Sequence, residues 1–368
     1  SPLSINPNSL YPLLLLLPVS QGCAKLTYIL PPGAPMETLT GVLFSIFFGF
    51  APMLLFAYLV FWTDRYEKEP LLLLGLVFLW GAIVAAGGAF VINTAAGIGV
   101  YLFTQSESFT IISTGSAIAP LIEELLKGAA VFLVFIIFRR EFDSILDGIV
   151  YAAIAGLGFA ATENAYYIYQ YGIAEGGLAG GFFMVFVRVI LVGWQHPFYT
   201  AFIGIGLAFA RLNKSLLLKI ISPLIGLALA IFTHAFHNTL AALLGGSTGL
   251  VIGTLIDWSG WLVMGVFILW ALFREQRWIA AHLREEVNLG IIDPQQYRTA
   301  CSAWAQAAAR TSAILNRRFR ITTRFYQVAA ELAFKKEQRL KMGEEGDNTA
   351  TINRLRTELG SLATQAQA

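Results

Sequence analysis

The sequence places acidic, basic and imidazole side chains inside long apolar stretches, where such chemistry is rare. A charged side chain at the centre of a bilayer costs about 2.5–3.5 kcal/mol on insertion scales, so these residues indicate a functional site. The run Ile122–Lys127 holds two adjacent carboxylates, Glu123 and Glu124, and ends in a lysine. The other members of the set are Glu163, Asn164, Arg188, His196, His234, His237 and Asn238.

Helical spacing predicts different roles for the two carboxylates. Lys127 lies four residues after Glu123 and three after Glu124, so it shares a helix face with each of them. The two glutamates themselves point about 100° apart. Lys127 can therefore neutralise one carboxylate and leave the other available as a base. His234 and Asn238, also four residues apart, share a face as well.

Residues that work together must lie at similar depths. Four of these residues lie 15 to 19 residues from the basic or polar end of their own apolar stretch, namely Glu123, Glu163, His196 and His234. At about 1.5 Å per helical residue this is roughly 22–28 Å. We therefore expect one shared polar cavity near the midplane or slightly beyond it. Outside the reactive group we interpret four residues as charge partners, helix-end groups or folding determinants, namely Lys127, Arg188, Asp147 and Asp257. Glu163 and Asn164 are either functional or helix-linking, and His237 is a supporting residue.

A carboxylate and an imidazole around one water-accessible point can activate water for attack on a carbonyl group. Hydrogen-bond donors such as Asn238 stabilise the developing oxyanion best in a site that contains little water. Alternatively, Glu123, His196 and His234 can hold a zinc ion whose bound water is the nucleophile. Both routes lead to amide hydrolysis, and the sequence leaves them open, so zinc is a cofactor candidate and no other cofactor is expected. A proton- or ion-coupled transporter is the alternative function, since midplane acidic and imidazole groups also form proton relays.

The composition predicts the elements that position these groups. Of 368 residues, 57% are hydrophobic and only 13% are charged, which excludes an ordinary soluble domain. Each of seven apolar stretches reaches the length of about 20 residues that spans a bilayer. These stretches are 39–62, 71–103, 111–138, 145–171, 178–210, 216–244 and 250–273. The expected fold is all-α, a polytopic helical membrane protein.

The charges of the connecting segments predict the topology. Segments with Arg65, Arg139 or Arg211 are basic, and they alternate with segments that have no Lys or Arg, so the basic ones should be cytoplasmic. The stretch 178–210 joins one kind to the other and should cross once, with a break near His196 and Pro197, because proline kinks a helix. This gives seven crossings, with the N-terminus outside and the tail inside. A hairpin at 178–210 would give eight.

We divide the chain into an N-terminal extracytoplasmic or interfacial segment 1–38, a membrane core 39–273 and a cytoplasmic helical tail 274–368. Residues 1–273 carry 10 basic and 13 acidic side chains, and the tail carries 15 and 10. The overall net charge of +2 is too small to indicate a nucleic acid partner. The tail should have breaks at 290–294 and 343–348. Its last helix, 352–363, needs a partner face, either on another molecule, by self-association, or within the tail.

The polar residues together resemble the PrsW family of intramembrane proteases over roughly residues 53–244. The matching motifs are Glu123-Glu124-x-x-Lys127, Asp147-Gly-Ile-Val-Tyr151, Gly158-Phe159, Glu163-Asn164, the isolated His196, His234-x-x-x-Asn238 and the acidic loop 64–70. The CAAX prenyl endopeptidases and the bacterial proteins grouped with them are more distantly similar. They have Arg one position beyond Lys127 and Phe where this chain has Val192, which favours the PrsW branch.

The resemblance implies roles for individual residues. Glu123 would activate the water, with Glu124 beside it and His196 sharing the water, while His234 and Asn238 would stabilise the oxyanion. It also implies a membrane-anchored protein substrate, such as an anti-sigma factor cut at its first site, and a location in the bacterial inner membrane. The family is often classed with metallopeptidases, although this sequence has no H-E-x-x-H motif.

Overall fold

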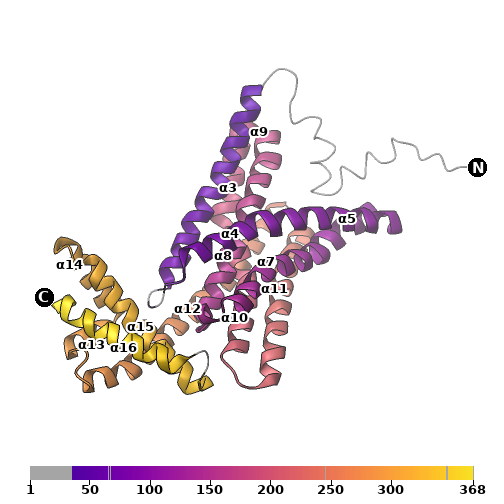
Figure 1. The fold of residues 1–368 in the computed structure, drawn as a ribbon. Coiled ribbons are helices and arrows are strands. Elements are labelled where there is room, and N and C mark those ends of the chain that lie inside the picture. The colour runs from indigo at the N-terminus through magenta and orange to yellow at the C-terminus, as the bar shows by residue number, and fades with distance from the viewer. Residues whose placement is uncertain (1–34, 65, 67, 245, 345–346, 368) are drawn as a thin grey trace, which may run out of the picture.

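The computed structural model describes residues 35–64, 66, 68–244, 246–344 and 347–367, and these contain helices and no strand. This confirms the all-α prediction. Residues 1–34 of the segment expected to be extracytoplasmic or interfacial, 1–38, lie outside the described residues. The long helices of the membrane core are α3 (Pro35–Thr63), α4 (Leu71–Leu79), α5 (Ala86–Thr104), α7 (Ala119–Ile137), α8 (Ile145–Tyr167), α9 (Ala174–Val185), α10 (Gln195–Arg211), α11 (Leu216–Leu244) and α12 (Gly246–Asn288). In Figure 1, α8 lies in the middle of the core, packed against α3 and α10, and α5 extends away from the other helices.

Short helical segments join several of these helices. The π-helical turn η3 (Trp80–Ala85) links α4 to α5, and η6 (Ile168–Ile173) follows α8. The helix α6 (Glu107–Ser113) and the π-helical turn η4 (Thr114–Ile118) lead into α7, and η7 (Phe186–Leu191) follows α9. Continuous helical runs of this kind keep backbone groups paired, as a bilayer requires.

Five of the described stretches are long and apolar enough to cross a membrane. They are Thr38–Thr63, Leu71–Thr104, Ile145–Arg211, Leu216–Leu244 and Thr248–Asn288. This supports a polytopic membrane protein. Within Ile145–Arg211, α8 and the run from α9 to α10 are antiparallel, and residues 107–137 form a further helical stretch whose apolar character is diluted by Glu123, Glu124 and Lys127. The number of seven crossings stays a prediction.

The chain from α9 to α10 runs back along α8 over its whole length. Pairs of residues that lie close together across these two antiparallel helical segments are Gly148 with Gly204, Gly156 with His196, Asn164 with Arg188, and Gly172 with Gly180. The stretch predicted to cross once therefore passes α8 once, and it is not a hairpin. Its helix breaks at residues 192–194, directly before α10, so Pro197 lies in the first turn of α10, where a missing backbone N–H is tolerated.

Small residues let α8 lie in the centre of the core. Ala152, Gly156 and Ala160, four residues apart on one face of α8, are all buried. A Cβ added at Gly156 would lie 2.7 Å from the carbonyl oxygen of His196, and one at Gly158 would lie 2.1 Å from that of Phe78. Backbone therefore packs directly against backbone on two sides of α8, and the position of His196 depends on this contact.

The tail forms a second helical cluster beside one end of the core, which we call the tail side (Figure 1). It consists of the end of α12 with α13 (Pro294–Ala300), α14 (Ala303–Leu315), α15 (Phe319–Met342) and α16 (Asn348–Gln367). The breaks predicted at 290–294 and 343–348 are present. The predicted boundary at 274 falls inside α12, which passes it without a break.

The last helix finds its partner inside the tail. Leu355 and Leu359 of α16 are buried in one cluster with Phe325 and Leu332 of α15. Within the described residues, this supports the interpretation in which the tail packs on itself. Lys335 of α15 also pairs with Asp143, which precedes α8, at 2.7 Å, so the tail is attached to the core.

Candidate active site

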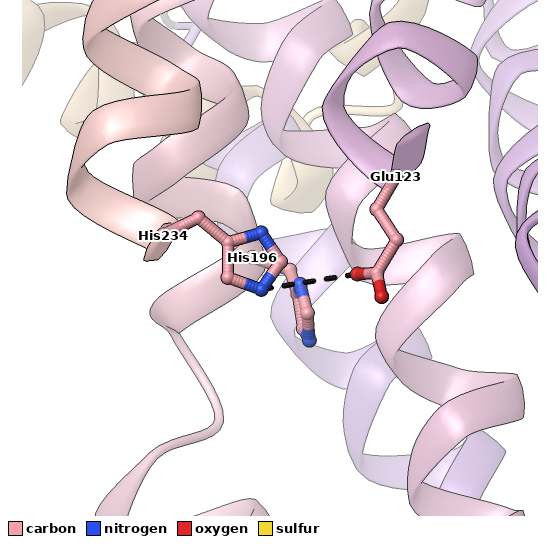
Figure 2. Close-up of side chains that lie close together, drawn as sticks. All are labelled: Glu123, His196 and His234. Carbon is pink, nitrogen blue, oxygen red and sulfur yellow. Dashed lines mark ion pairs between the residues drawn. The ribbon is translucent and has the colours of Figure 1, made fainter. Parts of the chain in front are cut away.

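Three of the predicted site residues converge from three helices (Figure 2). Glu123 comes from α7, His196 from the first turn of α10, and His234 from α11. One ligand atom of each lies within 4.8 Å of the others, and all three residues are buried. The structure thus brings together the groups that were expected at a common depth.

The two adjacent glutamates have different surroundings. Glu124 is fully buried and accepts hydrogen bonds from Lys127 Nζ at 2.5 Å, Thr200 Oγ1 at 2.9 Å and His234 Nδ1 at 2.9 Å. Glu123 Oε2 accepts no hydrogen bond and lies 3.9 Å from Lys127 Nζ and 3.8 Å from His234 Nε2. Lys127 therefore neutralises Glu124 and leaves Glu123 the less engaged carboxylate, as the spacing predicted.

Glu163 holds the ring of His196. Its Oε2 lies 2.8 Å from His196 Nε2, and the same oxygen is paired with Arg188. Arg188 Nε also donates to the Asn164 side-chain oxygen at 3.0 Å, so both residues of the Glu163-Asn164 motif are engaged. Lys127 Nζ lies 3.1 Å from His196 Nδ1. Because an ammonium group only donates, Nδ1 accepts, and the ring proton is on Nε2 facing Glu163.

His237 and Asn238 are held beside this cluster. Asn238 Nδ2 donates to the carbonyl oxygen of Gly115 at 2.9 Å, which leaves its second N–H available. His237 Nδ1 lies 3.0 Å from an oxygen of Asp257 on α12, and Gln195 donates to the same carboxylate. His237 is therefore turned towards α12 and does not join the Glu123 group directly.

Two of the residues around the site were missed by the sequence analysis. The Tyr199 ring stacks on His234 with centroids 4.8 Å apart and planes at 18°, and its hydroxyl is buried without a hydrogen-bond partner. Its spacing of three residues after His196 on one helix was the available signal. Gln195 had no comparable signal, because its role depends on the contact with α12.

These residues line a cavity of about 380 Å³. Its polar lining includes Glu123, Glu163, Arg188, Gln195, His196, Tyr199, His234, His237 and Asn238. Glu123, His196 and His234 are also, within the described part of the chain, the group of side chains whose types and separation could hold a metal ion. A Glu-His-His set is of the kind that binds catalytic zinc.

Comparison with known proteins identifies a family. Residues 69–273, more than half of the chain, match the PrsW family, described as intramembrane metalloproteases. The chain is 30% identical over 156 residues to Protease PrsW of Geobacillus kaustophilus, which covers 42% of this chain and 62% of that protein. It is 33% identical over 115 residues to Protease PrsW of Clostridioides difficile, covering 30% and 46%. It is 24% identical over 230 residues to Protease PrsW of Bacillus subtilis, covering 60% and 88%.

The chain thus spans less than two thirds of the length of the first two of these relatives. No solved structure matches it. The matched segment contains every helix that contributes to the cavity, from α5 to α11. On the extent of this match, the chain belongs to the PrsW family.

Proposed function

We propose that the chain is an intramembrane endopeptidase that hydrolyses a peptide bond of a membrane-anchored protein. The observation that carries this proposal is the Glu123 carboxylate, which has an oxygen without a hydrogen-bond partner and faces a cavity next to two oriented imidazoles. A group of this kind can take a proton from water and later return it.

The geometry supports a specific place for the water. His234 Nδ1 donates to Glu124, so its Nε2 is an acceptor, and it lies 3.8 Å from Glu123 Oε2. A water molecule between these two acceptors would donate one hydrogen to each, and its lone pair would remain available for attack. In this proposal His234 positions the water, whereas the family resemblance implied that it stabilises the oxyanion.

The remaining steps follow from the same groups. Glu123 accepts the proton of the attacking water, and the protonated carboxyl then gives it to the leaving amine. The second N–H of Asn238 is the donor we assign to the oxyanion. Glu163 and Arg188 hold His196 in one orientation, and Lys127 keeps the charge of Glu124 balanced, so Glu123 alone changes its protonation state.

We propose that this reaction is metal-free. Zinc would need one nitrogen of His196, but Nδ1 accepts from Lys127 and Nε2 bonds Glu163. The ammonium group of Lys127 is also only 3.9 Å from Glu123 Oε2, and it lies over the Phe159 ring at 4.4 Å. A positive charge fixed beside two of the three ligands repels a divalent ion. The side chains therefore suit zinc by type, but their present arrangement does not fit it.

The same proposal gives the orientation and the substrate class. Lys68, Arg139 and Arg211, from three connecting segments, line one cavity together with Lys335 of the tail. Clustered basic residues favour the cytoplasmic side, so we place the tail there and the N-terminus outside. Glu123 lies 16 residues from Arg139, roughly 24 Å along α7, so we expect cleavage in the outer half of a single-span protein. A regulatory membrane protein such as an anti-sigma factor is one such substrate.

The test compares membranes of cells that produce the parent protein or the Glu123→Gln variant. Quantitative mapping of new protein termini should find cleaved single-span proteins with the parent and none with Glu123→Gln. Glu175→Gln is the matched control, because Glu175 is an exposed carboxylate on α9. Retained cleavage in Glu123→Gln would refute the role of this residue, and product termini in the half of the substrate span nearer the tail side would refute cleavage in the outer half.

A further inference from the structure

The part of the cavity wall formed by α5 and η4 carries polar groups that the proposed reaction does not use. Asn93 of α5 and Thr114 of η4 both line the cavity, and both are more than nine-tenths buried. The Asn93 side-chain oxygen and the Thr114 hydroxyl have no hydrogen-bond partner. Glu123 and Tyr199 contribute two further unpartnered oxygens to the same cavity.

Such groups are costly inside a membrane protein. A buried polar atom without a partner costs about 1–3 kcal/mol, and a bilayer offers no alternative partner outside the cavity. Four of these atoms around one cavity therefore indicate that something polar occupies it during function.

An unwound peptide has the matching chemistry. In a helix, each carbonyl and N–H group is paired and the carbonyl carbon is shielded, so the segment to be cut must leave the helical conformation. Unwinding frees backbone donors and acceptors that must be paired again within the membrane. An amide oxygen accepts from an N–H group, and a hydroxyl can donate to a carbonyl group.

The cavity also has an opening and room for a backbone. Its lining includes Gly87 and Phe90 of α5 and Ile111 of α6, which are exposed, so the cavity reaches the surface of the core beside these two helices. A Cβ added at Gly87 or at Gly115 would meet no atom within 4 Å. The wall of the cavity therefore leaves space where a second chain could approach it closely.

We propose that Asn93 and Thr114 form a backbone-binding subsite for an unwound transmembrane peptide that enters beside α5 and α6. Asn93 Oδ1 accepts from a substrate N–H group, and the Thr114 hydroxyl donates to a substrate carbonyl. This subsite rests on the proposed function, since it delivers the peptide to Glu123. Because it recognises backbone, it tolerates many side chains and selects for segments that unwind easily.

The experiment measures binding rather than cleavage, in the full chain carrying Glu123→Gln and reconstituted in liposomes. The probes are two fluorescent synthetic peptides of about 25 Leu and Ala residues, a length that spans the bilayer. One is uninterrupted and the other has Gly-Pro-Gly in its outer half. We expect the interrupted peptide to bind at least tenfold more tightly than the uninterrupted one.

Two substitutions of similar shape then test the subsite. Asn93→Leu and Thr114→Val should each weaken binding of the interrupted peptide about threefold to tenfold, the usual effect of one lost neutral hydrogen bond. Thr254→Val is the matched control, because the Thr254 hydroxyl is also buried and unpartnered but does not line the cavity. It should leave binding unchanged. The unfolding temperature of Thr114→Val should equal or exceed that of the parent, since a solely structural role would lower it.

Several results would overturn the subsite. They are equal binding of the two peptides, no binding of the interrupted peptide, unchanged affinity in both cavity variants, or an equal loss in Thr254→Val. Unchanged affinity in both variants would mean that only water pairs with these groups. The proposed hydrolysis is judged separately by cleavage, so a binding failure together with loss of cleavage in Glu123→Gln would remove the subsite and keep the protease.

Discussion

Replacing Glu123 or Glu124 by glutamine should affect different properties of the protein. Replacing either by glutamine removes one negative charge and keeps the shape of the side chain. Glu124 accepts three hydrogen bonds, from Lys127, Thr200 and His234, whereas Glu123 Oε2 accepts none. We therefore expect Glu124→Gln to damage the fold and Glu123→Gln to damage the reaction.

The distances give the size of the effect. With an effective dielectric constant of about 20, Lys127 attracts Glu124 at 2.5 Å by about 7 kcal/mol and Glu123 at 3.9 Å by about 4 kcal/mol. Losing the nearer partner of a fully buried ammonium should destabilise the protein by about 3–5 kcal/mol. Glutamine at 123 loses the weaker attraction but also avoids burying a charge, so its stability should change by less than about 1 kcal/mol. Its cleavage rate should fall by about 10²- to 10⁴-fold.

The assay combines thermal unfolding in detergent with the cleavage rate per folded molecule, using a substrate found by terminus mapping. The double variant with Glu124→Gln and Lys127→Met is the control. It should be more stable than Glu124→Gln alone, because it leaves no unpaired charge in the core. If Glu123→Gln unfolds as readily as Glu124→Gln, or cleaves at more than about one tenth of the parent rate, the assigned division of roles is wrong.

Three further predictions concern other parts of the molecule. Gly156→Ala should reduce both the cleavage activity and the unfolding temperature, because the added Cβ would lie 2.7 Å from the carbonyl oxygen of His196. Gly99→Ala is the control and should change neither, because a Cβ at Gly99 would meet no atom within 4 Å. Equal effects of the two substitutions would contradict the packing argument. Cleavage by the purified protein should survive chelator treatment, since Lys127 lies where zinc would be repelled; loss of activity that zinc restores would refute the metal-free proposal. Burial raises the pKa of Asp64, in the loop after α3, to about 7 from 3.8, against the influence of nearby Lys68. The unfolded chain therefore ionises first, and up to about 4 kcal/mol of stability is lost as the pH rises from about 4 to 7. Asp64→Asn should be more stable than the parent at pH 8 and similar at pH 4 in thermal unfolding, and an unchanged pH profile would contradict this.

Much of the site could be predicted because a bilayer makes each polar residue informative. The spacing of Glu123, Glu124 and Lys127 gave the pairing of Lys127 with one carboxylate, and their positions along the apolar stretches gave the common depth with His196 and His234. The break before α10 followed from Pro197. These inferences use only helix geometry and the cost of charge in an apolar medium.

Other parts could not be predicted, because they depend on which helices touch. Asp257 was expected to be a charge partner, a helix-end group or a folding determinant, and only the packing of α12 beside α10 shows that it bonds His237 and Gln195. The spacing of Tyr199 three residues after His196 shows that the two share a helix face, but it does not show that the Tyr199 hydroxyl lacks a hydrogen-bond partner. The partner of the last helix stayed open for the same reason, because an amphipathic pattern shows that a face is buried and not what buries it.

The helix α12 runs without a break from the edge of the cavity into the tail, which the sequence analysis divided at residue 274. Asp257 bonds His237 at the edge of the cavity, and Glu286, 29 residues later on the same helix, is fully buried and paired with Lys336 and Arg356 of the tail. At 1.5 Å per residue these points are about 44 Å apart on one rigid rod. A rotation or tilt of the tail would therefore be transmitted along α12 and would move the Asp257 carboxylate relative to His237. The position of the tail would thus be coupled mechanically to the position of His237 at the edge of the cavity.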